Sequence, residues 1–247
     1  MKLKTFFKEN PRVALAFSGG VDSSYLLYAG LHYGADIRPY FIKTAFQPHF
    51  EFEDARLLTK QLGVKLHEIE IDILHSQTIV SNTFDRCYHC KSVLFGELKM
   101  HAFSDGYEVI IDGTNASDDE TGRPGMRAMQ ELSICSPLRE CGLTKDEIRR
   151  LSKEAKLLTW NKPAYACLAT RVPTGISLTA EMLGRIEKAE NALFKLGFRD
   201  FRVRVFSEAA RIQVRSEDMA KAIELANEIR NVLKPCFQVV LLDLESR

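Results

Sequence analysis

A glycine-rich turn between an apolar segment and a helical pattern constrains the fold of this chain more than any other feature. Residues 12–17 (Arg-Val-Ala-Leu-Ala-Phe) have the length and composition of a buried strand, and residues 18–24 (Ser-Gly-Gly-Val-Asp-Ser-Ser) open a helical pattern that continues to about residue 33. Glycines let the backbone approach an anion closely, and a helix N-terminus offers unpaired N–H groups. The segment therefore predicts a phosphate-binding loop, to which Ser18, Ser23 and Ser24 add hydroxyl donors.

This loop is not a Walker A motif, because the pattern G-x-x-x-x-G-K-[ST] is absent. The alternative to phosphate binding is an ordinary Gly-Gly turn with a polar helix cap. In either case we expect Asp22, Ser23 and Ser24 to cap the helix that follows.

Strand patterns and helix patterns alternate along the first two thirds of the chain. Such alternation is typical of the α/β class and predicts a parallel, doubly wound sheet with helices on both faces. The further strands are expected at residues 37–43, 64–71 and 107–111, and the further helices at 50–62, 92–103 and 144–158. The last of these begins with Thr144 as an N-cap, followed by acidic residues.

The pattern changes near residues 160–163 (Trp-Asn-Lys-Pro), where we place the boundary between a domain of residues 1–160 and a smaller one of residues 161–247. The smaller domain is expected to be of the α+β type. Its predicted elements are a helix at 179–196, strands at 201–206 and 210–214, a helix at 218–232 and a strand at 237–242.

Charge and hydropathy narrow the classes of partner. The formal net charge is +1, whereas proteins that hold long nucleic acids usually carry a basic excess, so the total favours a small-molecule substrate over nucleic acid. No apolar stretch approaches the roughly 20 residues that cross a bilayer, and the first ten residues do not resemble a signal peptide. We therefore expect a cytoplasmic protein without a membrane partner.

Two of the six cysteines form a C-x-x-C pair, Cys87 and Cys90, with His89 between them. This pair is half of a zinc site, half of an iron–sulfur site, or an accident of sequence. Zinc needs two further ligands, and there is no second C-x-x-C. An iron–sulfur cluster held by three thiolates leaves one iron open to an exogenous ligand.

Cys167 is the candidate third thiol, because it lies in the proline-flanked segment 162–173 at the predicted domain boundary. The nearby Arg171 favours a thiolate, although a lone cysteine in an apolar segment is often a core residue. Cys135, Cys141 and Cys236 are expected to be structural.

Arginines of the second domain form a candidate anion site. Arg202 and Arg204 alternate on a predicted strand and so point to one face, and arginine suits the bidentate recognition of phosphate. The alternative is a solvated strand face. Glu190, on the preceding predicted helix, either lines this site or is a surface charge.

The S-G-G-x-D-S motif after the first strand resembles that of the PP-loop ATP pyrophosphatases. In that family the loop grips the β- and γ-phosphates, ATP is cleaved between the α- and β-phosphates, and AMP is transferred to the substrate. The resemblance implies that Asp22 helps to hold Mg²⁺, and it assigns nucleotide binding to Ser18, Gly19, Gly20, Asp22, Ser23, Ser24 and Gly113.

Two further segments support the same resemblance. Residues 112–115 (Asp-Gly-Thr-Asn) follow the predicted fourth strand, where they would reach the nucleotide, and Ser136-Pro137-Leu138 followed by Lys145 resembles a recurrent PP-loop segment. The alternatives are a polar turn for the first segment and a helix lead-in for the second.

The PP-loop together with C-Y-H-C-K at 87–91 and P-A-Y-A-C-L-A-T-R-V-P at 163–173 resembles the LarE family over nearly the whole chain. These are ATP-dependent sulfur transferases of nickel-pincer cofactor synthesis, which adenylate the carboxylates of pyridinium-3,5-biscarboxylic acid mononucleotide and convert them to thiocarboxylates. The resemblance assigns the two domains to ATP cleavage and to substrate binding with sulfur transfer. It also implies a substrate-phosphate pocket formed by Thr170, Arg171, Arg202 and Arg204, which Lys91 approaches.

Two versions of the sulfur step are known in that family. In one, a cysteine at the position of Cys167 gives up its own sulfur; in the other, three cysteines hold a [4Fe-4S] cluster that carries an extra sulfide. Because Cys87, Cys90 and Cys167 occur together, we favour the cluster. The implied cofactors are ATP, Mg²⁺ and [4Fe-4S], with sulfide or another sulfur donor as a partner and a homo-oligomeric assembly.

Three other functions compete with this interpretation. A tRNA thiolation enzyme also combines a PP-loop with cysteines, but the net charge and the lack of a zinc ribbon or basic extension disfavour it. An amidotransferase-linked synthetase would not need the cysteines. A nucleotide-sensing protein would bind ATP without releasing pyrophosphate.

Overall fold

The computed structural model describes residues 2–118 and 124–247, which form two compact units. The larger unit comprises Met1–Ile73 and Asp85–Lys162, and the smaller comprises Leu74–Phe84 and Pro163–Arg247. The smaller unit is therefore built from two separate stretches of the chain. The functional division into domains 1–160 and 161–247 stays a prediction.

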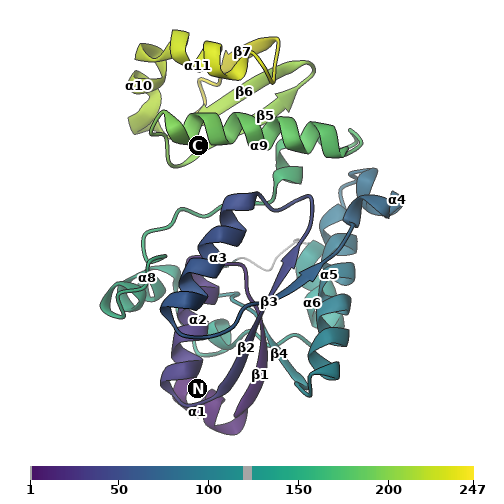
Figure 1. Cartoon of the computed structure of the whole chain (residues 1–247), viewed down its shortest axis with the longest axis vertical. Coiled ribbons are helices and arrows are strands. Elements are labelled where there is room, and N and C mark those ends of the chain that lie inside the picture. Colours follow the sequence, from purple (N-terminus) through teal and green to yellow (C-terminus); the bar gives the residue numbers. More distant parts are fainter. Residues whose placement is uncertain (1, 119–123) are drawn as a thin grey trace. The chain divides into compact units, whose positions relative to one another are not determined.

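A four-stranded sheet forms the centre of the larger unit (Figure 1). Its strands are β1 (Arg12–Ala16), β2 (Asp36–Lys43), β3 (His67–Glu70) and β4 (Val109–Ile111), in the order β3-β2-β1-β4. All three pairings are parallel, which confirms the predicted α/β architecture. The order places β1 between β2 and β4, so that the loops after β1 and β4 leave the same edge of the sheet side by side.

Two apolar cores cover the two faces of this sheet, because successive side chains of a strand point to opposite sides. Val13 and Leu15 pack with α1 (Leu3–Glu9), α2 (Val21–His32) and α3 (His49–Gln61). Ala14 belongs to the other core, to which α5 (Arg86–Ser104) contributes Leu98 and Ala102. Figure 1 shows the helices on both sides of the strands, as predicted from the sequence.

Several boundaries in the larger unit differ from the prediction. The helix expected at 92–103 begins already at Arg86. Its first residues mix charged, aromatic and thiol side chains, which gave no clear apolar periodicity. The strand expected at 64–71 is confined to His67–Glu70. α8 (Lys145–Glu154) ends before 158, and Lys156 then takes a left-handed backbone conformation with φ 55°. α6 (Pro124–Glu131) and α7 (Pro137–Glu140) had no counterpart in the prediction.

The smaller unit has a three-stranded sheet in the order β5-β6-β7. β5 (Phe201–Phe206) pairs antiparallel with β6 (Ala209–Val214), and β7 (Val239–Leu242) pairs parallel with β6, as an α+β unit permits. The single helix expected at 218–232 is wrong: α10 (Met219–Glu224) and α11 (Ala226–Leu233) are separated at Leu225. The unit also contains α4 (Gln77–Val80), η2 (Leu168–Arg171), α9 (Ala180–Lys195) and η3 (Ser216–Asp218).

Asn82 attaches the inserted segment 74–84 to the rest of the smaller unit. Its side-chain amide donates hydrogen bonds to the carbonyl oxygens of Pro173 (2.9 Å) and Ile176 (3.0 Å), and its own carbonyl accepts one from Gly175 N–H (2.9 Å). Asn82 is buried and has φ 53°, a conformation that asparagine tolerates better than most residues. η1 (Ile73–His75) lies where the chain enters this segment.

No helix in the described part of the chain is both long enough and apolar enough to cross a membrane.

Candidate functional site

The turn after β1 forms a compact loop at the N-terminus of α2. Gly20 is the N-cap residue, so the predicted capping by Asp22, Ser23 and Ser24 is wrong; these three lie in the first turn of the helix. Ser23 Oγ instead accepts a hydrogen bond from Ser18 N–H (3.3 Å) and donates one to the Gly20 carbonyl (3.3 Å). The serine side chains thus close the loop on itself.

Two glycines make this loop sterically feasible. Gly19 has φ +67°, and a Cβ there would lie 3.1 Å from Ala55 Cβ on α3. A Cβ on Gly113, in the loop after β4, would lie 2.9 Å from the backbone nitrogen of Ser23. The loops after β1 and β4 therefore touch through their backbones, as the strand order requires.

A hollow of about 240 Å³ opens where these loops meet. Its walls include four of the predicted nucleotide-binding residues, Asp112 of the predicted segment 112–115, and Asp118, which was not predicted. The lining residues are Ala16, Ser18, Asp22, Ser23, Phe95, Asp112, Gly113, Thr114 and Asp118. Ser24, the next residue of α2 after Ser23, is not among them; its Oγ is fully buried and has no hydrogen-bond partner among the described residues.

Asp112 is a buried carboxylate in the wall of the hollow. Oδ1 accepts a hydrogen bond from Ser136 Oγ (2.7 Å), and Oδ2 accepts one from Thr114 Oγ1. Burial raises the pKa of Asp112, against these hydrogen bonds and the nearby Lys91, which lower it. The segment Ser136-Pro137-Leu138 thus contributes a bond to this carboxylate.

Asp22 is held by two side chains from distant parts of the larger unit. Its Oδ2 pairs with Lys145 Nζ at 2.5 Å, and its Oδ1 accepts a hydrogen bond from Asn115 Nδ2 at 3.4 Å. The lysine is 123 residues away in sequence, so only the fold brings the pair together. The carboxylate and hydroxyl oxygens suit a divalent cation, and the backbone N–H groups suit the phosphates that accompany it.

The C-x-x-C pair lies at the N-terminal end of α5. Because Cys87 and Cys90 are three residues apart on a helix, they face the same side. Cys87 is exposed and accepts a hydrogen bond from Arg86 Nη2 (3.5 Å), whereas Cys90 is half-buried. The intervening His89 pairs with Asp85 (3.0 Å).

Lys91 follows the cysteine pair and points into the protein, with its Nζ 2.9 Å from Met129 Sδ. Burial lowers the pKa of Lys91, and the negative charges of Asp112 and of the two cysteines, when ionised, oppose that change. Among residues 2–118 and 124–247 no group of three or more His, Cys, Asp or Glu side chains is arranged to hold a metal ion. The predicted three-cysteine cluster therefore stays a prediction.

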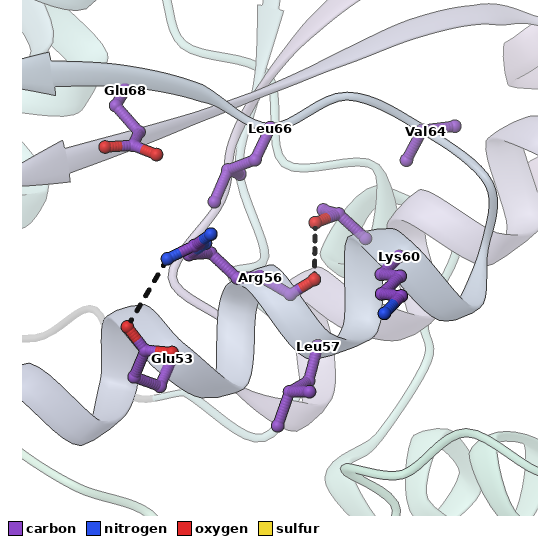
Figure 2. Close-up of a pocket in the computed structure, with 8 residues that line it drawn as sticks. Glu53, Arg56, Leu57, Lys60, Val64, Leu66 and Glu68 are labelled. Carbon is purple, nitrogen blue, oxygen red and sulfur yellow. Dashed lines mark hydrogen bonds and ion pairs between the residues drawn. The ribbon is translucent and has the colours of Figure 1, made fainter.

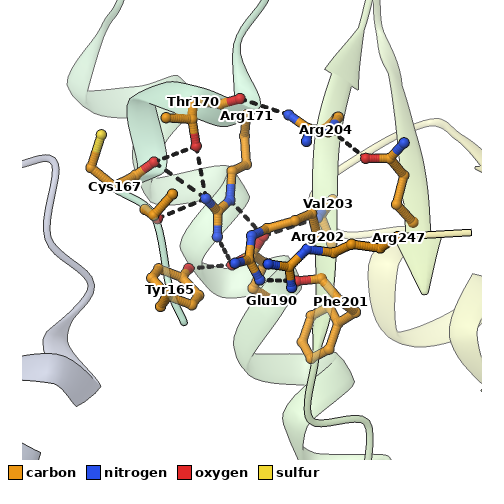
Figure 3. Close-up of polar contacts among 12 residues, drawn as sticks. Tyr165, Cys167, Thr170, Arg171, Glu190, Phe201, Arg202, Val203, Arg204 and Arg247 are labelled. Atoms are coloured by element: carbon orange, nitrogen blue, oxygen red, sulfur yellow. Dashed lines mark hydrogen bonds and ion pairs between the residues drawn. The ribbon is translucent and has the colours of Figure 1, made fainter. Parts of the chain in front are cut away.

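Cys167 lies in the smaller unit and caps the short helix η2. Its carbonyl oxygen accepts hydrogen bonds from Thr170 Oγ1 (2.8 Å) and Arg171 Nη1 (3.3 Å) (Figure 3). Arg171 Nη1 also donates to the Ala166 carbonyl (2.7 Å) and to Thr170 Oγ1 (2.8 Å). One guanidinium thus fixes the backbone on both sides of the Cys167 side chain.

Glu190, on α9, holds that guanidinium in place. Its Oε1 accepts hydrogen bonds from Arg171 Nε (2.9 Å) and from Val203 N–H (2.9 Å), and its Oε2 accepts them from Arg171 Nη2 (3.2 Å) and Tyr165 OH. The side chains of Arg171 and Glu190 are 0% and 2% exposed. The alternative of Glu190 as a surface charge is therefore wrong, since it is the centre of a buried network (Figure 3).

Arg202 and Arg204 lie next to this network, as Figure 3 shows. Arg202 Nη2 donates to the Ala164 carbonyl (2.7 Å), and Arg204 Nη1 donates to the Thr170 carbonyl (2.9 Å). The Tyr165 ring has Arg171 (4.4 Å) and Arg202 (4.9 Å) against it. Burial, reinforced by the charge of Arg171, lowers the pKa of Arg202 to about 10. The predicted phosphate pocket thus gathers its arginines around one segment, and their binding role stays a prediction.

A second, larger hollow of about 510 Å³ lies between α3 and the segment that leads into β3 (Figure 2). It contains none of the predicted site residues. Its acidic side chains, Glu53 and Glu68, balance its basic ones, Arg56 and Lys60, and Glu53 pairs with Arg56 at 3.7 Å. None of its lining residues is a glycine or lies in the first turn of a helix, so it lacks the backbone N–H groups that a phosphate site needs. The loop after β1 remains the candidate site.

No protein-family model matches the chain. The tRNA-specific 2-thiouridylase of a Thermotoga species is 24% identical over 186 residues, which cover 58% of this chain and 52% of that enzyme. The parallel sheet and the Ser-Gly-Gly-Val-Asp-Ser-Ser loop at the N-terminus of α2 agree with that relationship. Together they define a PP-loop fold of the α/β class.

Three relatives match almost the full length. An uncharacterised protein of Synechocystis is 34% identical over 98% of this chain and 92% of its own length, and one of Methanocaldococcus jannaschii is 32% identical over 99% and 95%. The pyridinium-3,5-bisthiocarboxylic acid mononucleotide synthase of Lactiplantibacillus plantarum is 31% identical over 96% of this chain and 87% of its own. The chain belongs to the family of that synthase, the LarE family, and it is an enzyme.

Proposed function

We propose that this enzyme inserts sulfur into the carboxylates of pyridinium-3,5-biscarboxylic acid mononucleotide at the expense of ATP. The observation that carries the proposal is the hollow at the N-terminus of α2, where backbone N–H groups, serine hydroxyls and the Asp22 carboxylate converge. Membership of the LarE family supplies the substrate class. The near-neutral charge of the chain agrees with a small nucleotide rather than a nucleic acid.

The loop residues suit the phosphates of ATP. Gly19 and Gly113 leave space that a Cβ would fill, and the buried Ser24 hydroxyl has no partner among the described residues. Asp22 would hold Mg²⁺, which keeps several waters and needs only one or two carboxylates beside substrate phosphates. When bound, the ion would neutralise charge on the phosphates. These features suit a nucleotide and its metal ion, and they do not require three carboxylates around the metal.

The first reaction would be adenylation. A substrate carboxylate oxygen attacks the α-phosphorus, the bond from that phosphorus to the bridging oxygen of the β-phosphate breaks, and pyrophosphate leaves. The product is an acyl adenylate, whose AMP is a far better leaving group than a carboxylate oxygen. The loop would hold the departing pyrophosphate with its N–H groups and with Ser18, Ser23 and Ser24.

The second reaction would replace the activated oxygen by sulfur and release AMP, once at each carboxylate. We propose that Cys87, Cys90 and Cys167 hold a [4Fe-4S] cluster, with sulfide or another donor supplying the sulfur. Three thiolates suit such a cluster because they leave one iron open to an exogenous sulfur ligand. The two thiols on one side of α5 fit this donor set.

We assign the phosphate of the substrate to Thr170, Arg171, Arg202, Arg204 and Lys91. Of the arginines, Arg204 would lose the fewest existing contacts on binding the phosphate. It is only partly buried, and its hydrogen bonds go to one carbonyl and to Gln213. Arg171 would act mainly by shaping the Cys167 segment. We further propose a cytoplasmic, homo-oligomeric enzyme.

An anaerobic iron and sulfide assay on wild type and on Cys87→Ala, Cys90→Ala and Cys167→Ala tests the sulfur step. About four irons per chain, lost in each variant, are expected for the cluster. If reconstituted wild type holds no iron, the alternative is a sacrificial Cys167, which would lose about 34 Da, the mass of H₂S, on turnover. Pyrophosphate release that depends on the substrate tests the adenylation separately, and binding without release would indicate a sensor.

A further inference from the structure

The ion pair between Asp22 and Lys145 places a lysine where the proposed Mg²⁺ would bind. Lys145 Nζ lies 2.5 Å from Asp22 Oδ2, and Asp22 lines the hollow of the phosphate loop. The pair is substantially shielded, with side-chain exposures of 28% for the lysine and 20% for the aspartate. The carboxylate oxygen nearest the lysine is thus already occupied by a cation.

Lys145 is held at this position by its backbone. Thr144 and Glu147 form a capping box that fixes the N-terminus of α8, and Lys145 N–H donates to Ser117 Oγ (3.0 Å) in the loop after β4. A lysine at the first residue of a helix faces the positive end of the helix dipole, which is unfavourable for the helix itself. The position of Lys145 therefore serves the contact with Asp22 and not the stability of α8.

Mg²⁺ and the lysine ammonium compete for the same carboxylate. Mg²⁺ requires oxygen ligands at about 2.0–2.1 Å in near-octahedral geometry. Two cations that share one carboxylate oxygen would lie only a few ångströms apart and repel each other strongly in a partly buried site. Asn115, which donates to the other oxygen of Asp22, restricts rotation of the carboxylate away from the lysine.

We propose that Lys145 occupies the metal position of Asp22 when no nucleotide is bound, and that its ammonium moves onto the phosphates when Mg²⁺ enters with ATP. The lysine thereby disfavours Mg²⁺ alone and favours the complex of Mg²⁺ and nucleotide. When Mg²⁺ binds alone, it displaces the ammonium and the lysine loses its ion pair. When ATP binds as well, its phosphates give the displaced ammonium a new anionic partner. This inference rests on the proposed ATP chemistry, and it assigns the order in which Mg²⁺ and the nucleotide bind.

The test compares two affinities in wild type and Lys145→Met, with Mn²⁺ counted by electron paramagnetic resonance as the probe of the metal position. Lys145→Met should bind Mn²⁺ alone about fivefold more tightly, because the competing ammonium is gone. It should bind Mg²⁺ with α,β-methylene-ATP about tenfold to hundredfold more weakly, because a charged contact to phosphate is lost. Adding Asp22→Asn to the variant should abolish the gain in Mn²⁺ affinity.

Lys43→Met is the matched control, since Lys43 also pairs with one carboxylate, Glu70, at 3.2 Å but lies on the surface. It should change neither affinity. Lys145→Gln replaces Lys145→Met if the latter does not fold. If Lys145→Met binds both Mn²⁺ and the analogue more weakly than wild type, the proposed exchange is wrong. It is also wrong if the variant binds Mn²⁺ as wild type does while wild type binds the analogue normally. Either result leaves the proposed ATP chemistry intact. A wild-type chain that binds no analogue would overturn the exchange and the proposed ATP chemistry together.

Discussion

Glu190→Gln should destabilise the smaller unit strongly while hardly changing the volume of the side chain. Arg171 and Glu190 are almost completely shielded from water, and the carboxylate accepts four hydrogen bonds. Removing one partner of a buried ion pair leaves the other charge uncompensated, which costs about 3–5 kcal/mol. The new amide also presents an NH₂ group to donors that need an acceptor.

We expect this loss in the free energy of unfolding of the smaller unit, measured by urea denaturation followed by circular dichroism at pH 7. The matched control is Glu181→Gln, an exposed glutamate in the first turn of the same helix, which should cost at most about 1 kcal/mol. Replacing both partners, in Glu190→Gln with Arg171→Met, should recover a large part of the loss because the uncompensated guanidinium at position 171 is gone.

A loss in Glu190→Gln as small as that of the control would refute the reasoning. It would mean that Arg171 finds another partner or water. A double variant less stable than Glu190→Gln would also refute it, since the penalty would then not come from an uncompensated guanidinium.

Three further substitutions test other contacts. Gly113→Ala should weaken the binding of an ATP analogue and cost about 1–3 kcal/mol of stability by overpacking against Ser23, as calorimetry and denaturation would measure. Asp112→Asn should stabilise the fold at pH 7. Because burial raises the folded pKa of Asp112 above its unfolded value, the wild type regains stability as the pH falls through that raised pKa, so the advantage of the variant should shrink toward pH 4 in parallel denaturation curves. Asn82→Gly, which keeps the left-handed backbone, should cost about 1–3 kcal/mol, and Asn82→Asp more, because a carboxylate would face two carbonyl oxygens; equal costs would contradict the role of the donated bonds.

The sequence was sufficient for the parallel sheet because its signals are local. The apolar segment of β1, the glycines after it and the helix pattern of α2 all lie within about twenty residues, and the strand order follows from such repeated units. Helix ends were less predictable where capping depends on tertiary contacts. The first residues of α5, Arg-Cys-Tyr-His-Cys-Lys, mix charged, aromatic and thiol side chains, so apolar periodicity did not reveal that Cys87 and Cys90 are helical.

The candidate site was predictable to the extent that its residues share a motif. The loop residues could be identified because they follow one strand, whereas Lys145 gained its partner only through the fold. Glu190 illustrates the same limit, since an isolated glutamate on an amphipathic helix carries no signal of burial. Its four hydrogen bonds come from three residues, Tyr165, Arg171 and Val203, in two segments of the chain, and no spacing in the sequence could indicate them.

The insertion of residues 74–84 into the smaller unit has a consequence for recombination between relatives. A crossover at the Lys162–Pro163 junction would join a foreign segment 74–84 to the native 163–247, and the amide of Asn82 would then face carbonyls that had not been selected with it. A fragment that starts at Pro163 would lack the segment altogether and leave the N–H groups of Gly175 and Leu178 without their backbone partners. The two stretches of the smaller unit therefore depend on each other, and an exchange that preserves folding must move residues 74–84 together with the C-terminal stretch.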